Sequence, residues 1–180
     1  MRILIAGVLG GLAMFIWSAV AHLALPLAEI GVSRLPNEAA TRAALQATVG
    51  DREGLYVFPY GPSAPQGPSG FLVYNAGNVL GLSPPTLVGE FAEETLESLI
   101  AAVLVGMAAL AGYWRRVGFV ALVGVAGVLT TNVSYWLWYR FPADYTLAYM
   151  FTDFVGYVAA GLVIAALVRP RISSAVPLAG

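Results

Sequence analysis

Residues 96–139 read LESLIAAVLVGMAALAGYWRRVGFVALVGVAGVLTTNVSYWLWY, two apolar runs separated by Arg115 and Arg116. The runs, 96–114 and 117–139, each meet the roughly 17–25 residues that a helix needs to cross a hydrocarbon core of about 30 Å. Arginine in a short loop between such runs is typical of the cytoplasmic side of a membrane. This stretch therefore predicts two antiparallel membrane helices joined by a cytoplasmic turn.

Two further apolar runs, 3–25 and 145–168, are long enough to span as well. Hydrophobic residues make up 59% of the chain and charged residues 11%, against roughly 45–50% and about 25% in soluble domains. We predict an all-α membrane protein, an antiparallel four-helix transmembrane bundle with a small external cap. An even number of crossings places both termini on one side.

The distribution of charge predicts which side that is. All ten acidic residues fall in two tracts, 29–97 and 144–153. Arg140 lies four residues before the second tract, and five of the nine arginines lie well away from both, near the ends of the apolar runs: Arg2, Arg115, Arg116, Arg169 and Arg171. By the positive-inside rule these arginines are cytoplasmic. The chain has no lysine, which we interpret as the bias of a GC-rich bacterial genome. We therefore predict a multi-pass protein of the bacterial inner (plasma) membrane with cytoplasmic N- and C-termini.

The predicted domains are a first membrane helix (1–27), an external, periplasmic cap (28–83) and membrane helices 2 to 4 with a cytoplasmic C-terminus (84–180). Within the cap, residues 37–49 favour a surface helix, capped by Asn37 and ended by Gly50.

Two β-prone runs in the cap, 55–60 and 71–75, predict a short hairpin, which must pack on another element because two strands alone are marginally stable. The tip between them, 61–70, is rich in glycine and proline and predicts a mobile loop. Ser83 followed by Pro84 is typical of a helix start, and we expect that helix to continue unbroken to Trp114.

The first apolar run has two features that allow more than one interpretation. Arg2, the run after it and the small residues at 19–21 imitate a cleaved signal peptide, but the apolar run continues to Leu27, which favours a retained helix. Gly7 and Gly11 have the spacing that lets membrane helices approach closely. We expect them to pack against another helix of this chain, with contact to a second copy as the alternative.

The residue inventory excludes several functions. The chain has no cysteine, no lysine and one histidine, His22. Thiolate sites, Schiff-base chemistry and multi-histidine haem or zinc sites within one chain are therefore excluded. Arg115 and Arg116 form the only basic cluster, so we expect no nucleic-acid partner.

The candidate site is a set of polar residues in the outer half of the predicted bundle. Asp153 lies about two turns inside the last helix, where a carboxylate is rare unless it faces the bundle interior or a wet cavity. His22, Glu97 and Asn132 lie at a similar depth on the other helices. Glu90, Glu94 and Glu97 share one helix face, with Glu93 turned away from it. The predicted ligand-binding residues are His22, Glu94, Glu97, Asn132, Tyr135, Trp136, Tyr149 and Asp153.

The expected pocket opens to the external side and would suit a cation, a polar head group or a quinone ring. The alternative is that these groups only satisfy one another as interhelical contacts. The sequence does not determine whether this site binds a metal, because the possible metal ligands are dispersed over four helices and form no local motif. The sequence indicates no particular cofactor.

Residues 132–149, with the aromatic run Tyr135-Trp136-Leu137-Trp138-Tyr139 and the stretch Phe141-Pro142-Ala143-Asp144-Tyr145-Thr146, resemble segments of small bacterial four-span membrane proteins that have no assigned function. The resemblance implies a topology and no activity.

The preferred functional hypothesis is a non-catalytic membrane protein, either an accessory subunit or a ligand-binding protein. One alternative is a membrane enzyme that uses Asp153 or Glu97 with His22, with or without a metal. The other is a small proton-coupled carrier, which would act as an oligomer because four helices are few for alternating access. Expected partners are membrane lipid and either another protein or a second copy, through the cap or the face of Gly7 and Gly11.

Overall fold

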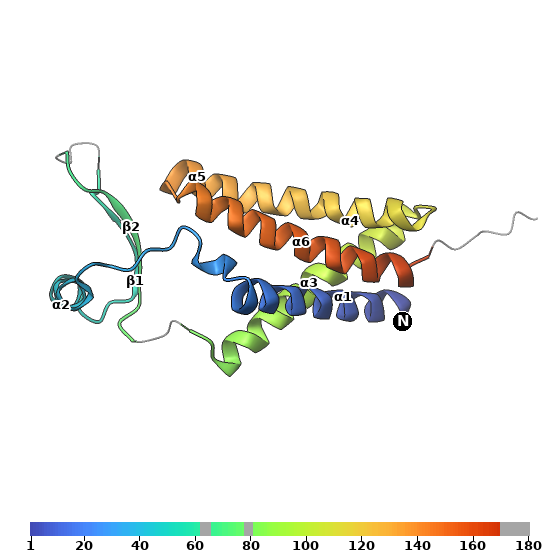
Figure 1. Ribbon diagram of the computed structural model, residues 1–180, viewed down its shortest axis with the longest axis horizontal. Coiled ribbons are helices and arrows are strands. Elements are labelled where there is room, and N and C mark those ends of the chain that lie inside the picture. The colour runs from blue at the N-terminus through green and yellow to red at the C-terminus, as the bar shows by residue number, and fades with distance from the viewer. Residues whose placement is uncertain (62–65, 78–80, 170–180) are drawn as a thin grey trace, which may run out of the picture.

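The computed structural model describes residues 1–61, 66–77 and 81–169. Residues 62–65 of the predicted tip and Arg171 lie outside this part of the chain. The elements, in chain order (Figure 1), are α1 (Arg2–Ala19), the π-helical turn η1 (Val20–Ala24), the 3-10 turn η2 (Leu27–Glu29), α2 (Glu38–Val49), β1 (Gly54–Phe58), β2 (Gly70–Tyr74), α3 (Pro84–Ala108), α4 (Tyr113–Val128), the π-helical turn η3 (Leu129–Val133), α5 (Ser134–Tyr139) and α6 (Ala143–Leu167).

Three continuous helical segments of the described chain are long and apolar enough to cross a membrane: Arg2–Ala24, Tyr113–Tyr139 and Ala143–Leu167. The prediction of a helical protein with spanning helices is confirmed to this extent. The fourth predicted helix, α3, has 25 residues but carries four glutamates within its first 14. Its passage through a membrane therefore stays a prediction.

The start of α3 is confirmed and its predicted end is wrong. The Ser83 hydroxyl accepts a hydrogen bond from the Thr86 amide at 3.3 Å, with Pro84 in the first turn. The helix ends at Ala108, because Ala109 adopts a left-handed conformation (φ 47°) and the chain turns back at Gly112 (φ +90°). A β-carbon makes the left-handed region unfavourable, so nothing in the sequence around Ala109 signals this stop.

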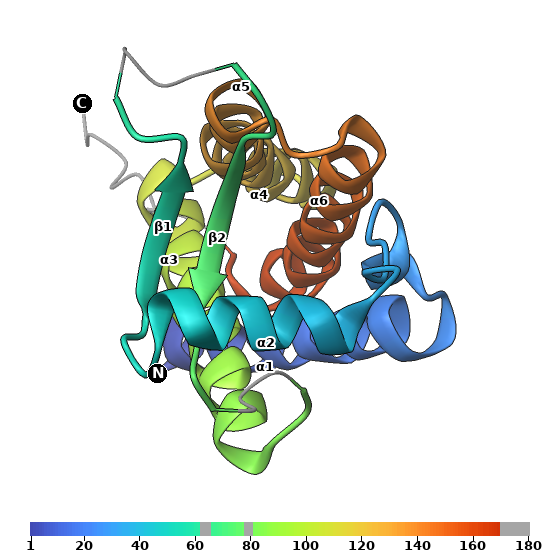
Figure 2. The ribbon, with the colours of Figure 1, turned by 90° about the vertical axis from the view of Figure 1, so that its left-hand side faces the viewer.

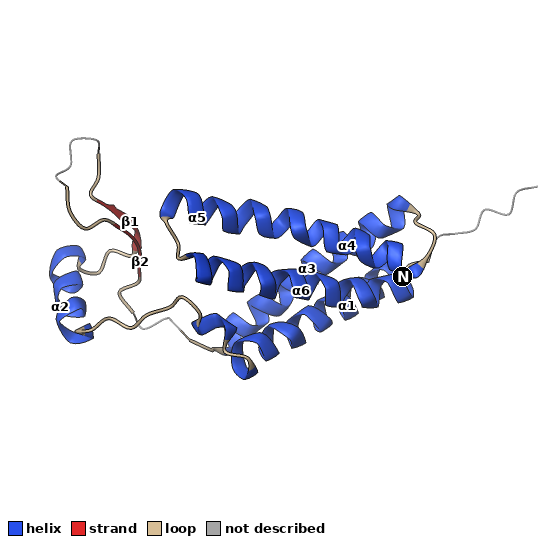
Figure 3. Ribbon diagram, turned by 45° about the horizontal axis from the view of Figure 1, so that its top comes forward, coloured by secondary structure: helices blue, strands red, loops and turns tan. Residues whose placement is uncertain are grey.

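Each of the four long helices α1, α3, α4 and α6 runs in the opposite direction to the one before it, and α3 crosses α1 and α6 at an angle (Figures 1 and 3). The first helix packs against both α3 and α6, and α6 packs against α1 and α4. A short turn joins α3 to α4 at the end where the N-terminus lies, which we call the turn end. From there α3 and α4 diverge toward the other end, where α2 and the hairpin lie (Figures 1 and 2).

Glycines on α1 allow α3 to approach its backbone. A β-carbon added to Gly11 would lie 2.5 Å from the Thr95 Cα atom, and one added to Gly7 would lie 2.8 Å from the Leu99 Cα atom. Both distances are below any that real side chains show. The close-packing face of α1 is therefore covered by α3 within this chain.

Arg116 is a buried guanidinium at the turn end, 7% exposed. Its Nε and Nη2 donate to the Ala165 carbonyl at 3.2 and 3.0 Å, and Nη1 donates to the Leu110 carbonyl at 3.0 Å. A cation is favourable there because the last carbonyls of α6 carry partial negative charge. One of the paired arginines is thus part of the packed structure, and the other, Arg115, is exposed.

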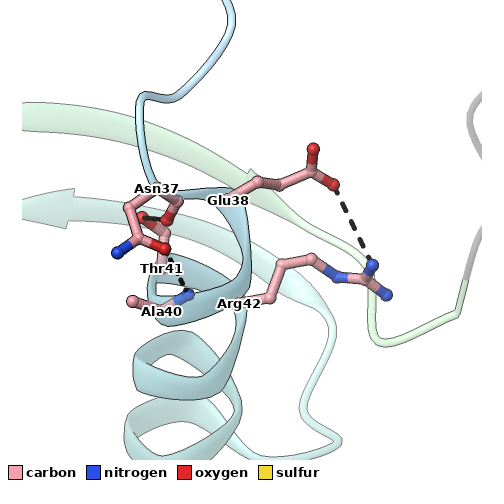
Figure 4. A network of polar contacts seen from close by, with 5 residues as sticks. All are labelled: Asn37, Glu38, Ala40, Thr41 and Arg42. Carbon is pink, nitrogen blue, oxygen red and sulfur yellow. Dashed lines mark hydrogen bonds and ion pairs between the residues drawn. The ribbon is translucent and has the colours of Figure 1, made fainter.

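The cap consists of the helix α2 and a two-stranded antiparallel sheet, so the predicted surface helix and hairpin are confirmed. The Asn37 side chain accepts from the Ala40 amide at 3.1 Å, and Glu38 and Arg42 lie 3.9 Å apart (Figure 4). The Tyr74 hydroxyl of β2 donates to the side-chain oxygen of Gln46 on α2 at 3.2 Å.

The cap also contacts the bundle. The ring of Phe71 on β2 stacks on Tyr139 of α5, with centroids 4.3 Å apart. The hairpin therefore contacts α2 through Tyr74 and the helical bundle through Phe71. Such contacts are expected because two strands alone are marginally stable.

The contact between α1 and α3 can be tested with Gly11→Ala. The added methyl meets the backbone of Thr95, so we expect the variant to lose about 1–3 kcal/mol of stability. Gly118→Ala is the matched control, because no atom lies within 4 Å of its added β-carbon. Thermal unfolding in detergent micelles, followed by circular dichroism, measures both. Equal midpoints for the two variants would contradict this packing.

Arg116→Gln should lower stability by about 2–3 kcal/mol, because it leaves the carbonyls of Ala165 and Leu110 without their charged donor. Arg115→Gln removes the same charge from an exposed position and should leave the unfolding midpoint unchanged. The same thermal measurement applies. A similar loss in both variants would mean that the buried hydrogen bonds contribute nothing.

Candidate functional site

A cavity of about 480 Å³ lies among the helices where α3 and α4 have diverged. All four long helices contribute to its walls. Its ionisable and amide side chains are His22 from η1, Glu90, Glu93, Glu94 and Glu97 from α3, Asn132 from η3, and Asp153 from α6. The remaining walls are mainly aromatic, small or apolar: Met14, Trp17, Ser18, Gly127, Val128, Thr131, Tyr149, Thr152, Gly156 and Tyr157.

The glutamates of α3 all line this cavity, including Glu93, which the helical spacing turned away from the others. Glu93 and Glu97 are one turn apart, as are Glu90 and Glu94, so the two pairs occupy adjacent strips of the helix surface. The cavity is wide enough to include both strips. The expectation that Glu93 stands apart is therefore corrected.

Glu94 has the most enclosed of these carboxylates, with 7% of the residue exposed. Its Oε2 atom is buried and has no hydrogen-bond partner among the described residues. An unpaired buried carboxylate is costly unless a proton or a cation neutralises it. Glu94 therefore marks the place where the cavity most needs positive charge.

Asn132 and Asp153 meet across the wall formed by η3 and α6. The Asn132 Nδ2 atom donates to the Asp153 Oδ2 at 3.4 Å and to the Val128 carbonyl at 3.2 Å. The amide thus holds one carboxylate oxygen, while Asp153 as a residue remains exposed to the cavity.

His22 is oriented by its own helix. Its Nδ1 lies 2.8 Å from the Ser18 carbonyl, and because a carbonyl can only accept, Nδ1 carries the proton. In the neutral ring Nε2 is then an acceptor. The ring lies edge-on to Tyr149, with centroids 6.3 Å apart. On the same wall the Trp17 Nε1 donates to the Thr152 carbonyl at 2.8 Å and joins α1 to α6.

Both π-helical turns of the described chain carry a cavity residue. The turn η1 (Val20–Ala24) contains His22, and η3 (Leu129–Val133) contains Asn132. A π-helical turn shifts the following side chains around the helix axis, and such turns occur frequently at functional sites. Sequence periodicity carries no signal for them, so they could not be predicted.

Six of the eight predicted site residues line the cavity: His22, Glu94, Glu97, Asn132, Tyr149 and Asp153. Tyr135 and Trp136 do not, because α5 continues past η3 toward the cap and places both beyond the cavity, exposed on the surface. Sequence reasoning missed Trp17 and Tyr157. The spacing of Tyr149, Asp153 and Tyr157, four residues each, contained the signal for the latter.

An unbroken series of aromatic contacts connects the cap to the cavity. Successive ring centroids lie 4.3 to 6.3 Å apart along the series Phe71, Tyr139, Tyr135, Phe141, Tyr145, Tyr149 and His22. Tyr135 therefore belongs to the connection between cap and cavity rather than to the cavity wall.

Positive charge is scarce around these carboxylates. No arginine lines the cavity, and the one ion pair within residues 1–61, 66–77 and 81–169 is Glu38 with Arg42, on the cap. His22 is the single cationic group that the cavity can supply. Five carboxylates, from Glu90, Glu93, Glu94, Glu97 and Asp153, thus share one space with one imidazole.

The carboxylates do not converge on a point. No three His, Cys, Asp or Glu side chains in the described part of the chain are grouped closely enough to hold a metal ion. The acidic side chains are instead spread along the walls of the cavity, on α3 and α6.

By fold and site the chain is a helical protein with three helices of membrane-spanning length and composition and a polar cavity between its helices. Comparison with protein-family models, with curated proteins and with solved structures found no match to it.

Proposed function

We propose that this chain is a non-catalytic multi-pass membrane protein that binds a small polar ligand in the cavity, either alone or as an accessory subunit. The observation that carries the proposal is a cavity of about 480 Å³, lined by carboxylates and aromatic rings, among helices of spanning length. Sites for small molecules are typically clefts of roughly 300–1,000 Å³ with a few placed polar groups. Interhelical contacts alone would leave no such space.

In this proposal α3 is the fourth spanning helix. Its 25 residues extend about 37 Å, more than a hydrocarbon core of about 30 Å requires. Its glutamates line the cavity, while its exposed side chains in the second half are apolar: Leu96, Ile100, Val103 and Met107. An apolar outer face and a charged inner face are what a membrane helix beside a wet cavity requires.

The arginines support an orientation. Arg2 and Arg169 line one surface hollow together with Ala109, which lies in the turn between α3 and α4, and Arg115 and Arg116 begin α4 just after that turn. These basic residues therefore gather at the turn end, away from the cap. The positive-inside rule then places the turn end in the cytoplasm of a bacterium and the cap and cavity on the periplasmic side.

The orientation can be tested by thiol labelling, since the chain has no cysteine of its own. In intact cells a membrane-impermeant maleimide should label Ser69→Cys, in the cap, at once. It should label Ala111→Cys, in the exposed turn between α3 and α4, only after permeabilisation. Immediate labelling of Ala111→Cys in intact cells would reverse the proposed topology.

Access to the cavity is tested with Thr131→Cys, whose side chain lines it. A small neutral methanethiosulfonate added outside should modify this thiol, because the proposal requires a cavity open to external water. Leu122→Cys is the matched control on α4, since Leu122 is 68% exposed on the outer surface and outside the cavity. There the thiol would face acyl chains and should stay unmodified. Equal reactivity at the two positions, or none at Thr131→Cys, would contradict the proposal.

A further inference from the structure

We propose that the ligand of the cavity is an organic cation bearing amino groups, held by Glu94 and Glu97 on α3 and by Asp153 on α6. This inference rests on the proposed binding function and specifies the chemistry of the ligand. It is carried by the charge of the cavity, by the enclosed carboxylate of Glu94, and by the spread of the acidic groups.

The charge of the cavity favours a positive occupant. Its walls hold five carboxylates and no arginine. Like charges that share a low-dielectric space repel one another strongly, and a cleft lined by one sign of charge concentrates the opposite ion by 10–10³-fold. Cations are therefore drawn into this space, and anions are excluded.

The enclosed carboxylate of Glu94 favours a ligand with N–H groups, independently of the total charge of the cavity. The residue lines the cavity with 7% of its surface exposed, and its buried Oε2 has no hydrogen-bond donor in the described structure. Nearby Asp153 differs, because the Asn132 amide already donates to one of its oxygens. A ligand N–H group would satisfy the acceptor capacity of Glu94 and compensate its charge at the same time.

The distribution of the acidic groups favours an organic cation over a metal ion. A Ca²⁺ ion takes 6–8 oxygen ligands at 2.3–2.6 Å from one centre. No three acidic or histidine side chains of the described residues gather in this way. An amine with several N–H donors along a carbon chain can instead reach carboxylates on opposite walls of a 480 Å³ cavity.

The uncharged walls suit the carbon part of such a ligand. Tyr149 and Tyr157 present aromatic rings, which attract ammonium groups to their faces. Met14, Val128 and Gly156 provide apolar surface for methylene groups. A bare inorganic cation would make no use of these walls.

The experiment measures charge selectivity at Thr131→Cys in proteoliposomes of zwitterionic lipid. A trimethylammonium and a sulfonate methanethiosulfonate are compared, and their rate ratio is divided by the ratio at the exposed Ser69→Cys of the cap. We expect the cationic reagent to be favoured by about tenfold or more after this correction. Spermidine at constant ionic strength should protect Thr131→Cys from a neutral reagent.

Two matched variants test the residues in the Thr131→Cys background. Glu94→Gln should weaken protection by spermidine at least tenfold, and Glu53→Gln, which removes the same charge from an exposed cap position, should leave it unchanged. Asp153→Asn repeats the test on α6 should Glu94→Gln fail to fold. Equal protection in Glu53→Gln and in the cavity variant that folds, Glu94→Gln or Asp153→Asn, would overturn the assignment of the carboxylates.

The remaining outcomes separate this inference from the proposed function. Labelling of Thr131→Cys by the neutral reagent, without charge preference or spermidine protection, would overturn the inference and leave the proposed function standing. Protection by Ca²⁺ or Mg²⁺ at lower concentration than spermidine would overturn it in favour of a metal. Charge preference that is absent at neutral pH and gained only as the pH is raised would mean that protons neutralise the cavity instead. No labelling at all would remove the proposed function itself.

Discussion

The close contact between the glycine face of α1 and the backbone of α3 is the constraint on which the rest of the structure depends. Gly7 and Gly11 let Leu99 and Thr95 approach to distances that a β-carbon would forbid. The first helix holds α3 on one side and α6 on another, so α4 packs chiefly on α6. Because α3 packs along α1 and makes little contact with α4, α3 and α4 separate toward the cap. The cavity lies between them.

The two ends of the bundle differ in whether their buried charged groups have hydrogen-bond partners. At the turn end, each nitrogen of the buried Arg116 guanidinium donates to a carbonyl, that of Ala165 or that of Leu110. Toward the cap, several carboxylates share a cavity with one imidazole, and the enclosed oxygen of Glu94 has no donor within the described chain. Packed interiors satisfy their polar groups. The contrast separates a turn end whose buried charge is paired from a cavity whose enclosed carboxylate is not, and that a cation compensates this carboxylate is our proposal.

Local chemistry explains which parts of the structure could be predicted. The caps at Asn37 and Ser83 are encoded by neighbouring residues, and both appear in the structure. The first and last apolar runs appear within a residue or two, as Arg2–Ala24 and Ala143–Leu167, whereas the bounds of the two middle runs differ by several residues. Depth along a helix follows from a constant rise, which is why residues as distant in sequence as His22 and Asp153 line one cavity. That this cavity binds a ligand remains a proposal.

The predictions that the structure corrects concern the end of α3 and the positions of Tyr135, Trp136 and Glu93. Each depends on a physical cause that the local sequence pattern does not encode. The left-handed stop at Ala109 occurs at a residue that does not favour it. The π-helical turns change the angular position of Asn132 and of everything after it, so Tyr135 and Trp136 could not be placed by counting at 3.6 residues per turn. Glu93 was misplaced because its helix faces a wide cavity and not a narrow seam.

The divergence of α3 from α4 can be measured most directly by double electron–electron resonance on pairs of spin labels attached to introduced cysteines. One pair, Val88→Cys and Leu137→Cys, reports on α3 and α5 at the cap end; the other, Met107→Cys and Trp114→Cys, reports on the turn end. All four positions are exposed. The account predicts a much longer distance for the first pair than for the second. Equal distances would show a closed, parallel-sided bundle with no room for the cavity.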